Sequence, residues 1–392
     1  MAPAARSSSP LDPASKASAA TTSAAAASQR TRMQSNAPLA PTPLPGSRPA
    51  FARARLVRGA AAALVACLST GCYLGHLAGG QSRLLLGRQP VEDVLARPAT
   101  PPALAARLRL AGEVRRFAER LGLAVGRQYT SYVDWPGDRV LTTVVAARPG
   151  AIDPHGFWFP IVGRVPYKGF FDPELAEREA ARLRQDGLDT CVVPVLAYST
   201  LGWLGDPITA PLARLGESRF AETLLHELLH ATVYVGGESQ FNEGLATFVG
   251  QEAVVRFFTE RDGLEAGARE RLRVEEDRRV AEVLLAFRGR VRALYAREAA
   301  GPARDAARAA LEQEARDDLA ALPLQTRDPL RVAEAARLSD ACQALAGTYQ
   351  SDLAQYDAVL ARLDGDLTRF VAEARRVERA RHPRTVLFAL AR

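Results

Sequence analysis

Residues 222–230 read Glu-Thr-Leu-Leu-His-Glu-Leu-Leu-His, and residues 242–246 read Asn-Glu-Gly-Leu-Ala. A helix turns once every 3.6 residues, so His226 and His230 present their imidazoles from one face and can hold a single ion. Catalytic zinc usually takes three protein ligands, and two His with one Glu is an established set. The sequence therefore predicts a zinc site on a helix, with Glu243 as the third ligand.

Glu227 follows the first of these histidines directly, so its side chain leaves the helix toward a water on the metal and not toward the metal. Zinc lowers the pKa of such a water to about 7. A carboxylate within hydrogen-bond reach can then take the proton and later deliver it to a leaving amine. We expect Glu227 to be the general base in the hydrolysis of an amide.

Each of these residues also has a structural interpretation. A His on an apolar helix face is usually a core residue, but the chain has only five His, and two stand at ligand spacing around a Glu that would be costly to bury alone. Glu243 taken by itself could be a surface residue. Glu252 is the competing carboxylate, but it lies more than two helical turns beyond Glu243.

The connection between the two motifs should bring them together. We expect the first helix to end at Gly236 and Gly237, because Gly accepts the left-handed conformation that closes a helix. A second helix should restart near Ser239 or Asn242, which puts Glu243 in its first turn.

The charge of the chain is concentrated in its first 71 residues, which contain eight basic residues and one acidic residue. These account for the whole net charge of +7, so the remainder is formally neutral. The chain after residue 71 therefore has no excess of basic residues of the kind that binds nucleic acid.

The end of this leader has the pattern of a secretory signal. Arg53, Arg55 and Arg58 precede an apolar run at 60–68, which is far shorter than the ~20 residues that span a membrane. Gly71 and Cys72 then resemble a bacterial lipoprotein box. We expect a lipid on Cys72 and a location in the bacterial cell envelope, on the periplasmic side. The alternative is an ordinary secreted leader, or one that only tethers the chain to the membrane.

Residues 1 to about 50 are rich in Ala, Ser, Pro and Thr and should be disordered, and translation could start at Met33. Beyond Cys72 the only cysteines are Cys191 and Cys342. One disulfide and two buried thiols both fit that count.

Apolar periodicity predicts an α+β fold, in which a small sheet packs with helices around the zinc-binding helix and a largely α-helical C-terminal half follows. We expect a leader at 1–71, a zinc peptidase core at 72–260 and a helical region packed on it at 261–392. The expected helices are Val91–Leu121, Pro173–Gln185, Pro302–Ala321, Pro329–Ala346, Leu353–Leu363 and Asp366–Arg379. The expected strands are Arg139–Ala147, Gly156–Val165 and Thr190–Leu196.

Several segments together resemble the predicted bacterial zinc aminopeptidase family, lipoproteins with a gluzincin-like site. The resemblance extends from Cys72 to about Arg379 and is strong to Val249. It implies His226, His230 and Glu243 as ligands and Glu227 as the catalytic carboxylate, in agreement with their spacing. Near residues 338–350 the family tends to have an Asn-rich segment and a Tyr-His pair, and this chain has neither the Asn pair nor the His. The matching segments, apart from the two helices, are Tyr132–Asp134, Phe159–Phe171 and Ala197–Trp203.

A peptidase also needs a donor for the oxyanion that forms when water attacks the carbonyl. Tyr198, at the end of a predicted strand, is the first candidate, and a Tyr packed at the sheet edge is the alternative; Tyr234 and Tyr349 are weaker candidates.

The predicted substrate is a peptide, and an aminopeptidase acting on short peptides is favoured over an endopeptidase. Asp134, Asp172, Asp206 and Glu238 are candidates for binding the α-ammonium, although each could be a solvated loop acid. The alternative function is a non-catalytic envelope lipoprotein that zinc stabilises and that binds a partner. The sequence leaves the oligomeric state open.

Overall fold

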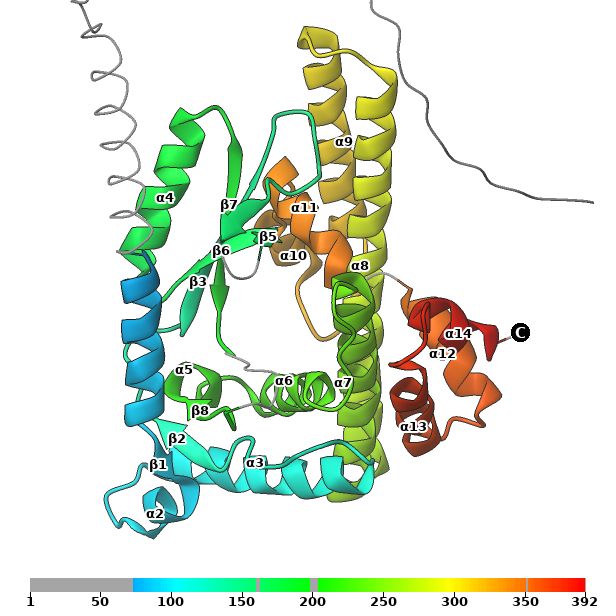
Figure 1. Ribbon diagram of the computed structural model, residues 1–392. Coiled ribbons are helices and arrows are strands. Elements are labelled where there is room, and N and C mark those ends of the chain that lie inside the picture. The colour runs from blue at the N-terminus through cyan, green and yellow to red at the C-terminus, as the bar shows by residue number, and fades with distance from the viewer. Residues whose placement is uncertain (1–72, 160–162, 198–203, 350–351, 392) are drawn as a thin grey trace, which may run out of the picture. The chain divides into compact units, whose positions relative to one another are not determined.

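The computed structural model describes residues 73–159, 163–197, 204–349 and 352–391 (Figure 1). The chain divides into two units, Met1–Ala62 and Ala63–Arg392, and every described residue belongs to the second. Within the described ranges, the helices contain no stretch with the length and apolarity needed to cross a membrane.

A three-stranded antiparallel sheet has β3 (Leu141–Ala147) at its centre, between β6 (Tyr167–Phe170) and β7 (Asp189–Val195). Alternate side chains of β3 point to opposite faces, and both faces are covered. Val144 and Ala146 pack with α4 (Pro173–Gln185), whereas Val145 and Ala147 pack with α11 (Asp340–Tyr349). The predicted strands at 139–147 and 190–196 and the predicted helix at 173–185 are confirmed within two residues.

The predicted single strand at 156–165 is wrong, because this run folds back on itself. β4 (Phe157–Phe159) pairs antiparallel with β5 (Gly163–Val165) as a separate two-stranded ribbon. Pro160 cannot donate a ladder hydrogen bond and Gly163 weakens a strand interior, so the aromatic run is interrupted at its centre.

The predicted helix at 91–121 is two helices, α2 (Val91–Ala96) and α3 (Pro102–Arg120). Two prolines explain the break: Arg97, directly before Pro98, is extended and ends α2, and Pro102 occupies the first position of α3. A second sheet has the order β1 (Gln89–Pro90), β2 (Ser131–Val133), β8 (Ile208–Thr209). The chain passes from β8 through α5 (Ala210–Ala213) into α6 (Glu217–His230).

The helical half extends from α7 (Ser239–Asp262), which packs on α6. Next come α8 (Leu264–Arg297) against α7, and α9 (Pro302–Ala320) against α8. The predicted helix at 329–346 is divided into α10 (Pro329–Ala335) and α11. Ser339 separates them, because its side chain accepts a hydrogen bond from the N–H of Cys342 and caps a new helix.

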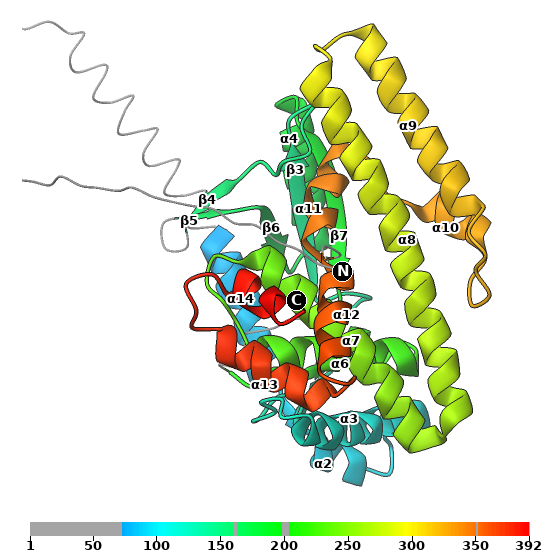
Figure 2. The same ribbon diagram turned by 90° about the vertical axis from the view of Figure 1, so that its right-hand side faces the viewer.

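The last helices are α12 (Leu353–Arg362), α13 (Leu367–Val377) and α14 (Pro383–Ala389). The first two agree with the predicted spans 353–363 and 366–379, whereas α14 was not predicted. They surround the buried ring of Tyr356, which contacts Phe248 of α7, Phe370 and Phe388. α12 and α13 pack against α7, on the side away from α6 in Figure 1, and Figure 2 shows the same helices from the side.

A disulfide joins Cys191 of β7 to Cys342 of α11, with 5.1 Å between the two Cα atoms. The two alternatives for these cysteines are therefore decided in favour of the bridge. The bridge ties the sheet to a helix 151 residues later. The predicted boundary at residue 260, between a peptidase core and a helical C-terminal region, stays a prediction.

Candidate metal centre

Three potential metal ligands converge between α6 and α7. The Nε2 atoms of His226 and His230 lie 3.2 Å apart, and Oε2 of Glu243 lies 3.4 Å from each of them. The side chains are largely buried, with exposed fractions of 18%, 6% and 25% respectively. The structure thus brings together the three residues that the sequence singled out as ligands.

The spacing of these atoms fits zinc. Ligands about 2.05 Å from a tetrahedral zinc ion are separated from one another by about 3.3 Å. The three observed separations of 3.2–3.4 Å agree with that value. Two imidazoles and one carboxylate are also a donor set that catalytic zinc uses, and it leaves one tetrahedral position for water.

The close approach of the two helices depends on Gly250 of α7. A Cβ atom at this position would lie 3.3 Å from the carbonyl oxygen of Glu222 and 3.4 Å from the Cβ of His226. Gly250 therefore lets α7 pack closely on the turn of α6 that carries the histidines, and a side chain larger than that of Ala would push the two helices apart. The spacing between α6 and α7 in turn affects the distance from the histidines to Glu243, about two helical turns earlier on α7.

The predicted end of the first helix at Gly236 and Gly237 is wrong, because α6 ends at His230. Thr232 closes the last turn: its hydroxyl donates to the carbonyl of Leu228 and accepts from the N–H of Ala124. The β-branched residues of the segment 232–235 also disfavour a helix. The predicted restart at Ser239 is confirmed.

The charges of the centre support one another even without an ion. Burial alone would raise the pKa of Glu243, but hydrogen bonds and charges from His226 and His230 lower it to about 2. Burial would lower the pKa of His226, whereas the hydrogen bond to Glu243 and the charges of Glu227, Glu243 and Glu222 raise it overall. The site is thus preorganised to hold positive charge.

Glu227 lies beside this cluster with its side chain partly exposed. Its carboxylate makes no hydrogen bond or ion pair with any residue in the described part of the chain. Its carboxylate is therefore available to a water or a substrate, as a general base requires.

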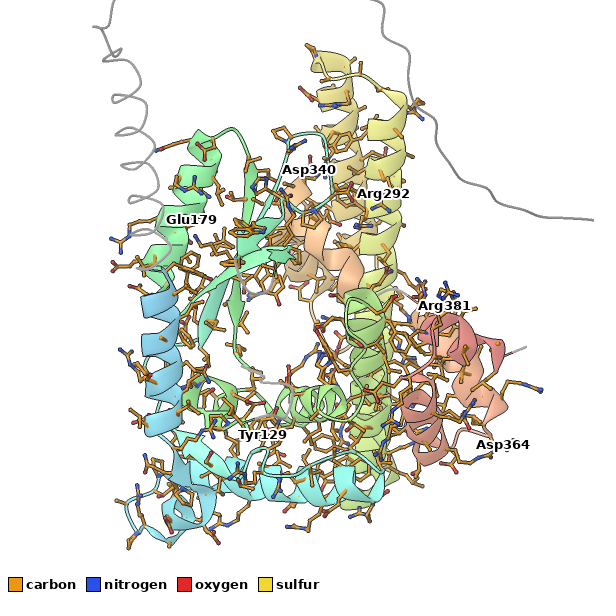
Figure 3. All side chains as sticks on the ribbon, viewed as in Figure 1. Tyr129, Glu179, Arg292, Asp340, Asp364 and Arg381 are labelled. Atoms are coloured by element: carbon orange, nitrogen blue, oxygen red, sulfur yellow. A yellow bond between two sulfur atoms is a disulfide. The ribbon has the colours of Figure 1, made fainter. Side chains whose placement is uncertain are left out.

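Two tyrosines near the centre were missed by the sequence reasoning. Tyr129 is buried between α3 and α6 (Figure 3) and has a left-handed backbone, with φ at 59°. Burial and then the charges of Glu227 and Asp206 raise the pKa of Tyr129 well above its usual value. No motif marks Tyr129, because it meets Glu227 only through the tertiary fold.

Tyr167, the first residue of β6, is the second of these tyrosines. The pKa of Tyr167 is raised, mainly by desolvation and then by the charge of Glu243. The residue nevertheless keeps 45% of its surface exposed. Tyr167 belongs to the segment Phe159–Phe171 that carries the family resemblance, which was the only signal in the sequence.

The other predicted positions are as follows. Cys72 and Tyr198 lie outside the described residues, and Tyr349 ends α11. Tyr234 is 43% exposed, and its N–H donates to Glu378. The competing carboxylate Glu252 is buried and paired with arginines at 256, 271 and 278, away from the three ligands.

The four candidate acids for the α-ammonium differ in their surroundings. Asp206 is fully buried and paired with Gln128, and Asp172 caps α4 through the N–H of Glu174. Asp134 and Glu238 are exposed. Of the four candidates, Asp134 and Glu238 are therefore the ones whose side chains are open to solvent.

The chain was compared with protein families, curated proteins and solved structures. Residues 72–386 match the family model described as "Putative aminopeptidase". No curated protein and no solved structure matches the chain. Since the family model covers most of the sequence, the chain belongs to this aminopeptidase family.

Proposed function

We propose that this protein is a zinc-dependent peptidase. The observation that carries the proposal is the convergence of His226, His230 and Glu243 at the spacing of zinc ligands. The carboxylate of Glu227 lies beside them and has no partner among the described residues. Membership of an aminopeptidase family supports peptide-bond hydrolysis as the reaction.

The residues would act in separate roles. His226, His230 and Glu243 would hold the ion, which when bound supplies positive charge that acidifies water and polarises a peptide carbonyl. Glu227 would take a proton from the attacking water and pass it to the leaving amine. A hydroxyl that donates to the oxyanion would complete the site, and Tyr198 and Tyr167 are the candidates.

We further propose that the substrates are short peptides cut from their N-termini. An aminopeptidase must bind a free α-ammonium, for which a carboxylate near the metal is the usual physical means. Digestion of a free peptide library beside the same library with acetylated N-termini tests this point. Equal cleavage of both libraries at interior bonds would contradict the aminopeptidase assignment and leave an endopeptidase.

The proposed location is the periplasmic side of the bacterial envelope, with a lipid on Cys72. The bridge between Cys191 and Cys342 supports an oxidising compartment, because disulfides persist there and are rare in the cytosol. Cys72→Ser should move the protein from the membrane fraction to the soluble fraction; a distribution that does not change would contradict the anchor.

Metal analysis and kinetics test the proposed chemistry. Purified protein should hold one zinc, Glu243→Ala should lose it, and Glu227→Gln should keep it while hydrolysis falls by orders of magnitude. Activity that survives Glu227→Gln, together with loss of stability on chelation, would support the alternative of a non-catalytic protein stabilised by zinc.

A further inference from the structure

Positive charge is concentrated where α13 ends and the chain turns into α14. Residues 373–384 contain five arginines and two glutamates, a net charge of +3, although the chain after residue 71 is formally neutral as a whole. Figure 2 shows the turn between the two helices as a red loop. Two of the five arginines are paired, Arg376 with Glu373 at 2.7 Å and Arg384 with Asp352 at 2.6 Å.

The other three arginines of this segment have no acidic partner among the described residues. Arg375, Arg379 and Arg381 are exposed and form no ion pair there. Arg375 only donates, at 3.5 Å, to the carbonyl of Gly122. We call these three residues the Arg379 surface. Since a guanidinium has five N–H donors and no acceptor, the Arg379 surface can bind an anion from solvent.

The Arg379 surface borders the connection between the two helices of the metal centre. Oε1 of Glu378 accepts a hydrogen bond from the N–H of Tyr234 at 3.0 Å. The next residue, Val235, is bonded on both sides of its peptide backbone by the side chain of Asn242. Asn242 directly precedes the proposed ligand Glu243. A short series of contacts therefore leads from the arginines to the metal centre.

We propose that the Arg379 surface selects acidic peptides by binding their carboxylates, downstream of the bond that is cut at the metal centre. This inference rests on the proposed peptidase function and names the substrate class. The planar fork of a guanidinium matches a carboxylate. An extended peptide advances about 3.4 Å per residue, so side chains a few residues beyond the cut can pass the α6–α7 connection and reach the arginines.

The local charge favours this class of substrate. The exposed or partly exposed acids that accompany the three arginines are Glu238 and Glu378, and Glu378 is engaged by the N–H of Tyr234. The positive charges therefore outnumber the negative ones. Clustered charge of one sign raises the local concentration of ligands of the opposite sign. Peptides that carry several carboxylates should thus be concentrated beside the metal centre.

The test uses three pentapeptide amides with a free N-terminus, in which two Ala are followed by three Glu, three Gln or three Lys. Amidation removes the terminal carboxylate, so only the side chains differ in charge. The test variant combines Arg379→Gln with Arg381→Gln. The matched control combines Arg269→Gln on α8 with Arg331→Gln on α10, which removes the same charge at side chains that are 65% and 86% exposed.

We expect the parent protein to have its highest kcat/KM on the Glu peptide, through a lower KM, and its lowest on the Lys peptide. The test variant should lower the ratio of kcat/KM on the Glu peptide to that on the Gln peptide about fivefold, as expected for two exposed charge pairs. The control should leave this ratio unchanged. Raising the salt from about 0.05 M to about 0.5 M should bring the ratio toward one.

Binding is measured separately from hydrolysis. The Glu and Gln peptides, with a dye at the C-terminus, are titrated with Glu227→Gln protein, and anisotropy should show tighter binding of the Glu peptide. If the parent hydrolyses no peptide, the proposed peptidase function is wrong, and equal binding of the two labelled peptides then overturns the inference as well.

Hydrolysis of all three peptides at the same kcat/KM would leave the peptidase function intact and overturn the inference. An equal fall of the ratio in the control would do the same, because the effect would then come from overall charge. If anionic vesicles bind the parent and not the test variant, while the peptide ratio is the same in both, the occupant of the Arg379 surface is lipid and the proposal is wrong.

Discussion

The side chain of Asn242 exchanges two hydrogen bonds with the backbone of Val235. Oδ1 accepts from the Val235 N–H at 2.9 Å, and Nδ2 donates to the Val235 carbonyl at 2.8 Å. Asn242 is buried, so water does not compete for these bonds. The pair fixes the turn between α6 and α7 one residue before Glu243, and Asn242 therefore positions a proposed metal ligand.

Asn242→Ala should weaken both the fold and the metal site. It leaves the N–H of Val235 without a partner and removes one of the two hydrogen bonds to the Val235 carbonyl, which still accepts from the N–H of Glu238. This should cost about 1–3 kcal/mol of unfolding free energy. Loss of a residue that orients a ligand typically lowers metal affinity 10- to 100-fold. Denaturant unfolding and zinc competition measure the two effects, with the exposed Gln240→Ala as control. Unchanged zinc affinity would refute the positioning role.

The close packing at Gly250 gives a second prediction. Gly250→Ala should have a small effect, because better helix propensity, worth up to ~1 kcal/mol, offsets the tight contact with Glu222. Gly250→Val should cost about 1–3 kcal/mol, since the added methyls push α7 away from α6. Zinc affinity should fall with it. Gly236→Ala is the control, because a Cβ there meets no atom within 4 Å. Equal zinc affinity in Gly250→Val would show that helix spacing does not set the site.

The cluster of His226, His230 and Glu243 could be predicted from the sequence because its geometry is local. Helical periodicity alone puts His226 and His230 on one face, and the return of the chain after Gly237 puts Glu243 nearby. The strand at β3 and the helix α4 were also predictable, since each has its own apolar period and turn residues. These features need no knowledge of distant contacts.

Other features depend on distant contacts and could not be predicted in the same way. The end of α6 depends on a hydrogen bond between Thr232 and the N–H of Ala124, 108 residues away. Tyr129, which lies between α3 and α6, comes under the charge of Glu227 only when these two helices pack together. The arginines that pair with Glu252 come mostly from the next helix. Local periodicity contains no information on such pairs.

Glu252 gives a prediction about acid stability. Burial alone would raise its pKa, but Arg271, Arg256 and Arg278 lower it to about 2, from an ordinary value of 4.5. A lowered folded pKa contributes stability that is complete above about pH 4.5 and is lost as the pH falls toward 2. The shift corresponds to about 3 kcal/mol.

Glu252→Gln should therefore destabilise the metal-free protein by about 3–5 kcal/mol at pH 7 and by much less near pH 3. Unfolding of both proteins in urea at the two pH values gives the comparison. Glu265→Gln, at a fully solvated carboxylate, should change stability little at either pH. A difference that does not depend on pH would exclude the ion pairs as its source.

The disulfide gives a fourth prediction. Replacing both Cys191 and Cys342 by Ser should lower the unfolding free energy by about 2–5 kcal/mol, because the bridge closes a loop of 151 residues. A reductant should lower the midpoint of the parent protein and leave the double variant unchanged. Equal midpoints for the oxidised parent and the double variant would contradict a stabilising role.

The last prediction concerns the hydroxyl that donates to the oxyanion. Tyr198 is the candidate from the sequence and Tyr167 is the candidate from the structure, because the charge of Glu243 acts on it. A donor that acts only in the transition state lowers kcat when it is removed and leaves KM nearly unchanged. We therefore expect Tyr198→Phe or Tyr167→Phe to lower kcat about 100-fold. Tyr234→Phe, at an exposed residue in the same region, is the control. Full turnover in both variants would leave the oxyanion without a tyrosine donor and would require a backbone N–H in that role.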